Sequence, residues 1–163
     1  MNRKEETIVI EYTHILVATD FSPVAEKAAR RASELAMLTG GRLTLLHVLE
    51  HFPEDIPNHS IAPENVDPEQ FYTEKARTEL EELRNNLGPK GSATAVEIIV
   101  STDVDVVVSA YSAGREISGY ASQHNMDLIV LGIHGKRGFL GIAGSVATNV
   151  LHTASVDVLA VRL

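Results

Sequence analysis

Five glycines stand at every third position from Gly132 to Gly144, after an apolar run and before a stretch that favours a helix from Ser145. Glycine has no Cβ, so its backbone can adopt positive φ angles and bring N–H groups close to a phosphate. A helix that follows the loop adds free N–H groups and the positive end of its dipole. The pattern therefore predicts an anion-binding loop. Because glycines also serve plain turns, a glycine loop without a ligand stays open as the alternative.

Asp20 is a second residue suited to ligand binding, and it follows the apolar run 14–19. An open, doubly wound sheet binds ligands at the carboxyl ends of its strands, where the strand order reverses. If the strands before Asp20 and Gly132 are neighbours at that point, both residues face one crevice. Asp20 could then accept a hydrogen bond from a ribose hydroxyl, while the amides around Gly144 and Ser145 hold phosphates. A turn and helix-cap role for Asp20 is the alternative.

Several better-known sites are excluded by their missing motifs. An ordinary P-loop has Ser or Thr after Gly-Lys, whereas Arg137 follows Gly135-Lys136 here. The dinucleotide pattern G-x-G-x-x-G and the hydrolase pattern G-x-S-x-G are also absent. His47 falls in a predicted strand and His51 in a predicted loop, so they form no helical metal pair. We therefore predict no metal site and assign no catalytic residue.

Composition and charge narrow the class of protein. The chain has 163 residues, which suits one domain, and it has no cysteine, which excludes disulfides, thiolate metal sites and a cysteine nucleophile. No segment has the ~18–20 apolar residues of a membrane helix, and the charged N-terminus does not look like a signal peptide. The net charge of −8 opposes general attraction to nucleic acid. We expect a cytoplasmic protein without membrane insertion or nucleic-acid binding.

Short β-rich runs alternate with longer helical patterns, and this alternation predicts an α/β fold with a mainly parallel sheet and helices on both faces. Between 51 and 68, four prolines indicate a long surface loop. The runs 96–100 and 104–108 both have strand-like composition, and one could be an extra edge strand. Strands are predicted at 14–19, 42–49, 128–131 and 156–162, and helices from Ser22-Pro23 to Gly40, over 68–87, after 112–114 and over 145–154.

At the glycine loop, Gly132-Ile-His-Gly135 to Gly144-Ser145, the chain resembles the universal stress protein family. Further matching blocks occur in the same order, so that the resemblance runs from about residue 13 to the end. It implies a single open five-stranded sheet of order 3-2-1-4-5. It also implies a domain over 13–163 with a variable loop at about 51–68, preceded by an N-terminal extension, 1–12. The matching blocks are 15–22, 45–48, 127–135 and 156–162.

The ATP-binding branch of that family uses a G-x2-G-x9-G-[ST] loop, and this chain has eight rather than nine positions between Gly135 and Gly144. Ala147 stands where some ATP-binding members have a hydroxyl, so one phosphate contact is lost. By position, the resemblance places Ala18, Asp20 and Val48 around adenine and ribose. Lys136 and Arg137 could add phosphate charge or be a solvated surface pair. The predicted nucleotide-binding residues are Ala18, Thr19, Asp20, Val48, Leu131, Gly132, His134, Gly135, Lys136, Arg137, Gly144, Ser145 and Val146.

The resulting functional expectation is an ATP-binding regulatory protein of the stress response that acts as a dimeric switch on an unknown protein partner. Its cofactor would be ATP, with or without Mg²⁺, or another adenine nucleotide. The dimer would form through the strand 156–162, because this apolar edge has neither proline nor lysine to prevent pairing with another chain. A slow ATP-hydrolysing or phosphate-transferring enzyme and a ligand-free interaction module are the alternatives.

Overall fold

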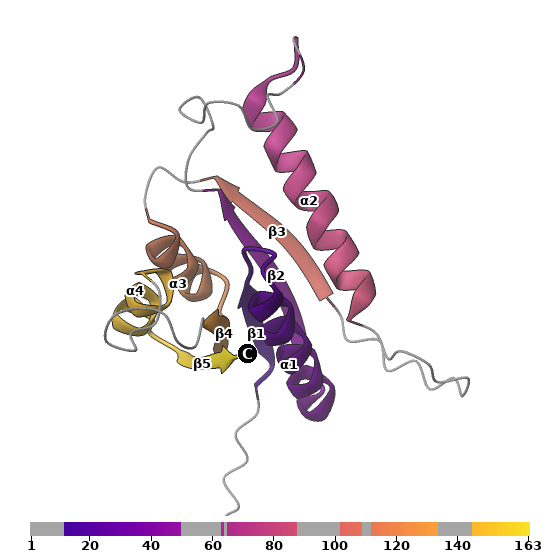
Figure 1. Ribbon diagram of the computed structural model, residues 1–163. Helices are drawn as coiled ribbons and strands as arrows, with labels where there is room; N and C mark the ends of the chain where they lie inside the picture. Colours follow the sequence, from indigo (N-terminus) through magenta and orange to yellow (C-terminus); the bar gives the residue numbers. More distant parts are fainter. Residues whose placement is uncertain (1–11, 50–62, 64, 88–101, 109–111, 134–144) are drawn as a thin grey trace, which may run out of the picture.

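The computed structural model describes residues 12–49, 63, 65–87, 102–108, 112–133 and 145–163. Strands and helices alternate strictly along these segments (Figure 1), as the sequence predicts. The elements are β1 (His14–Ala18), α1 (Pro23–Thr39), β2 (Arg42–Leu49), α2 (Pro68–Asn86), β3 (Thr102–Val108), α3 (Ala113–Gln123), β4 (Leu128–Ile133), α4 (Ser145–Thr153) and β5 (Asp157–Arg162).

The strands form one open sheet of order β3-β2-β1-β4-β5, in which every neighbouring pair is parallel. The expected order is therefore confirmed. The order reverses between β1 and β4, where Ala18 pairs with Leu131. Of the two strand-like runs before α3, the one at 104–108 belongs to β3. The other, 96–100, lies outside the described residues.

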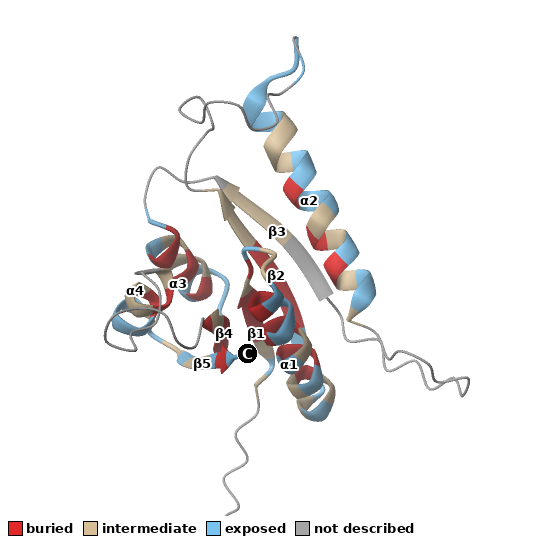
Figure 2. Ribbon diagram, viewed as in Figure 1, coloured by how far each residue is buried: buried red, intermediate tan, exposed pale blue. Residues whose placement is uncertain are grey.

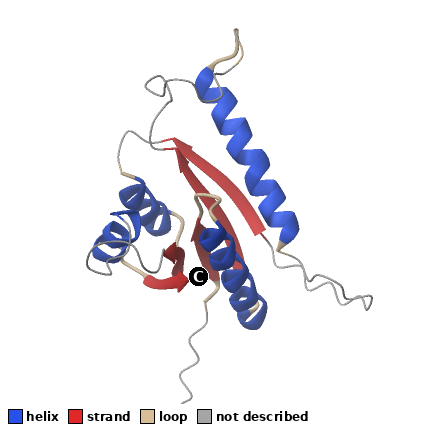
Figure 3. Cartoon of the chain, in the orientation of Figure 1, coloured by secondary structure: helices blue, strands red, loops and turns tan. Residues whose placement is uncertain are grey.

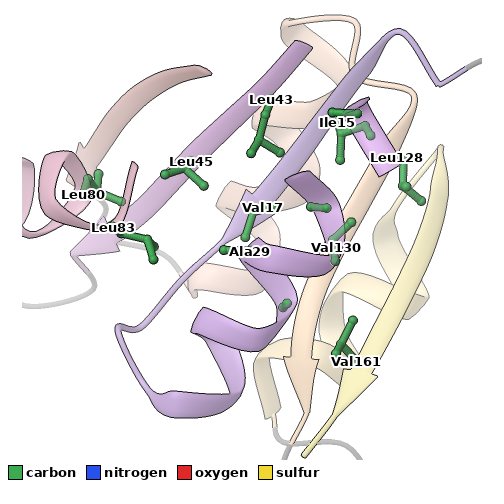
Figure 4. Close-up of a cluster of buried hydrophobic side chains, with 13 residues drawn as sticks. Ile15, Val17, Ala29, Leu43, Leu45, Leu80, Leu83, Leu128, Val130 and Val161 are labelled. Atoms are coloured by element: carbon green, nitrogen blue, oxygen red, sulfur yellow. The ribbon is translucent and has the colours of Figure 1, made fainter. Parts of the chain in front are cut away.

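Helices cover both faces of the sheet, as Figure 3 shows. On one face, α1 and α2 pack against β1, β2 and β4 around a buried apolar cluster that includes Ile15, Leu45 and Leu80 (Figure 4). On the other face, α3 and α4 bury a second cluster with Leu46 and Ile129. Figure 2 shows this burial along the middle strands, whereas the outer side of α2 is exposed. Both faces of β1 and β4 are thus covered, which explains their nearly continuous apolar sequence.

The beginning and end of α1 follow from local sequence signals. The Ser22 hydroxyl accepts a hydrogen bond from the amide of Ala25 at 3.4 Å, and Pro23 occupies the first helical position. Gly40 ends the helix with φ +69°, a left-handed conformation that glycine adopts without steric cost. A stripe of small residues faces the sheet, so the helix lies close to β1 and β4. The fully buried members of this stripe are Ala28, Ala29, Ala32 and Ala36.

The boundaries of the sheet at its amino end are fixed by polar contacts. One carboxylate oxygen of Asp127 accepts hydrogen bonds from the backbone N–H of Thr13 and of His14, each at 2.8 Å, and from the Thr13 hydroxyl at 2.7 Å. The Tyr12 hydroxyl donates to Asp157 at 2.9 Å and ties the entry of β1 to the first residue of β5. None of the helices in the described segments is long and apolar enough to cross a membrane.

Candidate functional site

A pocket of about 360 Å³ opens at the carboxyl ends of β1, β2 and β4, next to the point where the strand order reverses. Its volume is in the range of small-molecule sites, which hold ~300–1,000 Å³. The pocket brings together residues that lie more than 100 positions apart in the chain. Seven of the residues predicted from the sequence line it: Ala18, Thr19, Asp20, Val48, Leu131, Gly132 and Val146.

The other predicted residues belong to the loop after β4 and the beginning of α4. Ser145 is the first residue of α4, next to Val146 in the pocket wall. The remaining five predicted residues fall between the described segments 112–133 and 145–163, and they are His134, Gly135, Lys136, Arg137 and Gly144.

The turn between β1 and α1 forms one rim of the pocket. The Thr19 amide donates to the carbonyl oxygen of Leu46 at 2.9 Å, and the Thr19 hydroxyl accepts from the Phe21 amide at 3.0 Å. Phe21 itself has φ +61°, which is uncommon for a residue other than glycine. These hydrogen bonds compensate the cost of that conformation and fix the direction in which the turn leaves the sheet.

Asp20 makes the turn contact that the sequence offered as one of its two roles, and it also lines the pocket. Its Oδ1 accepts a hydrogen bond from the Ser22 amide at 3.0 Å, which is a turn contact. Asp20 also lines the pocket and is exposed. A carboxylate has about four lone-pair sites on its two oxygens. The turn contact is therefore compatible with a further hydrogen bond to a ligand.

His47 is a pocket residue that the sequence analysis did not assign to the site. Its Nδ1 lies 2.8 Å from the carbonyl oxygen of Thr19, and its ring centroid lies 4.6 Å from that of Phe21. A carbonyl only accepts, so Nδ1 carries the proton and donates. A single polar residue in the otherwise apolar second half of β2, residues 45–49, directly before Val48, is the signal that could have indicated it.

The wall of the pocket beneath this rim is apolar. Leu46 and Leu131 come from the sheet, and Ile117 comes from α3. Small residues, Ala113 and Ala147, stand where the helices α3 and α4 approach the opening, so the helices leave space there. The remaining lining residues that were not predicted are Ala25 and Leu49. An apolar wall with a few polar groups at the rim is typical of small-molecule sites.

Gly132 has a packing role as well as a place in the pocket. A Cβ at this position would lie 2.7 Å from the carbonyl carbon of Val24 and 2.8 Å from the amide nitrogen of Ala25. The absence of a side chain therefore lets β4 approach the first turn of α1. Only glycine fits between the end of β4 and the beginning of α1.

Among the residues that the structure describes, no group of three or more His, Asp or Glu side chains lies close enough together to hold a metal ion. The described rim of the pocket offers one carboxylate, that of Asp20, and one imidazole, that of His47.

The universal stress protein family matches residues 11–162, and the chain belongs to this family. The universal stress protein A homolog 1 of Coxiella burnetii is 34% identical over 152 residues, which are 93% of this chain and 97% of that protein.

Solved structures agree in fold. The universal stress protein UspA from Lactobacillus plantarum has a TM-score of 0.68 at 26% identity and covers 94% of this chain and 100% of its own. The universal stress protein from Archaeoglobus fulgidus in complex with dAMP has a TM-score of 0.56, and a universal stress protein in complex with cAMP has a TM-score of 0.60, both at 20% identity. Each spans 93% of this chain, and the matches cover 99% and 98% of the two chains respectively.

Proposed function

We propose that this chain is an adenine-nucleotide-binding regulatory protein of the stress response, with ATP as its ligand. The observation that carries the proposal is the pocket at the reversal of strand order, which gathers seven residues assigned to a nucleotide from the sequence alone. The complexes of two family members with dAMP and cAMP support the adenine class.

The geometry suggests how the nucleotide would lie. Adenine would pack on the apolar wall near Ala18, Val48 and Leu131, because a flat ring buries most area there. The ribose would then meet Asp20 at the rim. Phosphates would point along the glycine loop toward the beginning of α4, where free N–H groups and the helix dipole favour negative charge. Any Mg²⁺ would be held by the phosphates.

As a regulator, the protein would change its loop conformation or its dimer equilibrium when ATP binds, and a protein partner would read that change. Such a switch requires ATP to bind the two states unequally. The dimer would form through β5, and the cytoplasmic location stays a prediction. Slow hydrolysis of bound ATP and a ligand-free interaction module are the outcomes that would replace this proposal.

Asp20 provides the sharpest test of nucleotide binding. Asp20→Asn keeps an oxygen for the turn contact with Ser22 but removes the charge, whereas Asp20→Ala removes both. If the carboxylate binds the ribose, calorimetric titration should show that the free energy of ATP binding is less favourable by about 1 kcal/mol in Asp20→Asn and by ~1–3 kcal/mol in Asp20→Ala. Asp67→Asn, at the exposed cap of α2 where Asn caps equally well, is the matched control.

A 2′,3′-dideoxy analogue of ATP separates the ribose contact from a turn effect. It should bind wild type more weakly than ATP does, and it should bind the wild type and Asp20→Ala about equally. A variant that still strongly prefers ATP over the analogue would leave Asp20 as a turn residue only. Mass spectrometry of any small molecule that accompanies the purified protein would identify the nucleotide, and product analysis after incubation with ATP would reveal hydrolysis.

A further inference from the structure

A second pocket, of about 200 Å³, lies at the opposite edge of the sheet, where the strands begin. His14 and Arg42 are the first residues of β1 and β2 and pair in the parallel register. Two aromatic rings at the end of α3 form the other side. The pocket is lined by His14, Arg42, Thr44, Tyr120, His124 and Met126.

The guanidinium of Arg42 is oriented by His14. Nδ1 of His14 lies 3.3 Å from the carbonyl oxygen of Asn125, which can only accept, so Nδ1 is the donor of this pair. The other ring nitrogen, Nε2, is then an acceptor, and it contacts the Arg42 guanidinium. One N–H of the guanidinium is used in this way, which leaves the rest of its planar fork for other acceptors.

Among the side chains that the structure describes, which do not include that of Asp103 opposite Thr44 on β3, no carboxylate forms an ion pair with Arg42. The ion pairs found there join Arg31 with Glu34 and Arg84 with Glu81. The described residues that line the pocket include no acidic one. Asp127, directly before β4, uses one oxygen for three hydrogen bonds from Thr13 and His14.

Further donors stand on the other sides of the same pocket. The His124 ring is stacked on Tyr120 with a centroid separation of 4.0 Å and an interplanar angle of 21°, so its orientation is restricted. Thr44 is 7% exposed and lies two residues after Arg42, so both residues are on the same face of β2. On the neighbouring strand β3, the Asp105 carboxylate accepts from the Val106 amide at 2.9 Å. The lining therefore offers the Arg42 guanidinium, the His124 ring and the Thr44 hydroxyl as hydrogen-bond donors.

We propose that this pocket is a second ligand site, which binds a phosphate-type oxyanion through Arg42, His124 and Thr44. A planar guanidinium suits two parallel hydrogen bonds to an oxyanion. A water molecule takes ~30 Å³, so the pocket has room for a phosphate with a short organic group. The anion would supply the negative charge that the described surroundings of Arg42 lack.

The site is separate from the nucleotide pocket. Along β1, His14 of the second pocket and Ala18 of the first are four residue steps apart, which is ~13 Å at 3.3 Å per residue. Both pockets have lining residues from β1, β2 and α3, but no residue lines both of them. On α3, Ile117 lines the first pocket and Tyr120 lines the second. The proposal therefore does not rest on nucleotide binding.

Titration of the full chain with inorganic phosphate, followed by ¹H–¹⁵N NMR, tests it. We expect saturable chemical-shift changes of the backbone amides of Arg42, Thr44 and His124. The affinity for phosphate should fall about tenfold or more in Arg42→Gln. Arg31→Gln removes the same charge from an exposed position on α1 and should leave these shifts unchanged. Arg42→Lys, which keeps the charge but not the fork, should lie between wild type and Arg42→Gln.

His124→Gln, at the exposed end of α3, is a second variant in case Arg42→Gln disturbs the fold, and it should also weaken the saturable shifts. Methyl phosphate distinguishes the source of the anion: tighter binding than phosphate indicates a phosphorylated small molecule, and weaker binding indicates free phosphate. Shifts confined to Gly132 and Val146, shifts that never saturate, or equal weakening by Arg31→Gln would overturn the proposal.

Discussion

Nδ1 of His47 lies 2.8 Å from the carbonyl oxygen of Thr19, so the end of β2 holds the end of β1 by a side chain as well as by the sheet. The same ring contacts Phe21, whose backbone has a positive φ. His47 thus supports the turn from two directions. Because Asp20 lies between Thr19 and Phe21, the position of its carboxylate depends on this support.

We predict that His47→Leu lowers the affinity for ATP about five- to tenfold. The Thr19 carbonyl loses its hydrogen-bond donor, and the turn can then move Asp20 away from the ribose. His47→Asn keeps an N–H group near the position of Nδ1 and should restore most of the affinity. Calorimetric titration measures both variants. If the loss in His47→Leu is the same for ATP and its dideoxy analogue, His47 does not act through the ribose contact.

Gly132→Ala should destabilise the protein by about 1–3 kcal/mol, because the new Cβ would overlap the backbone of Val24 and Ala25. Gly119→Ala is the matched control: nothing lies within 4 Å of a Cβ there, and alanine in a helix should stabilise by about 0.5–1 kcal/mol. Urea unfolding measures both. Equal effects of the two substitutions would show that the approach of β4 to α1 can relax at little cost.

Asp127 should make stability depend on pH in the acid range. Burial raises its pKa, but the hydrogen bonds from the Thr13 hydroxyl and from the His14 and Thr13 amides outweigh burial and lower it. A lowered pKa in the folded state means that the unfolded chain binds more protons. The ionised Asp127 carboxylate therefore stabilises the fold fully at pH values above the ordinary Asp pKa of about 4. This stabilisation is lost as the pH falls toward the pKa of Asp127 in the folded state.

Asp127→Asn should therefore lower the free energy of unfolding by about 1–3 kcal/mol at neutral pH. The difference in free energy of unfolding between wild type and variant should shrink below about pH 4. Thr13→Val removes one of the three hydrogen bonds and should show a smaller effect of the same sign. Urea unfolding over a pH series measures both. A difference that stays constant down to about pH 3 would contradict a role of the Asp127 charge.

The helices and strands could be predicted because each carries a local signal. Ser22-Pro23 and Gly40 bound α1, and the apolar run of β2 has the length and composition of a buried strand. The order of the strands and the assignment of the pocket residues needed the resemblance to a family, since right-handed crossovers alone allow several orders. Whether 96–100 or 104–108 belongs to the core was not decidable, because both runs have the same strand-like composition.

The contacts that cross between elements could not be predicted. His47 was read as a strand residue, and its bond to Thr19 depends on the parallel register of β1 and β2. Gly132 was read as part of a phosphate loop, although its backbone neighbours on α1 also require glycine. Long-range juxtapositions of this kind carry no local pattern in the sequence.

The edge strand β5 is suited to pairing with a second copy of the chain. In the described part of the chain, β5 pairs with β4 on one side only. Tyr12 fixes its first residue, Asp157, so the strand is held before any dimer forms. Ala160 on this strand is exposed, and Leu163, the residue after the end of β5, is 72% exposed. A cyclic dimer would cover this apolar edge.

Ala160→Lys should shift the dimer toward monomer, because two lysines would face each other across the twofold axis near an apolar edge. Ala160 is the better position than Val158, which packs against the core of the α3 and α4 face and would damage the subunit if replaced. Ser122→Lys, at an exposed position on α3, controls for the added charge. Light scattering at micromolar concentration measures the mass. A monomeric wild type would refute the dimer, and any response to a nucleotide would then have to act within one subunit.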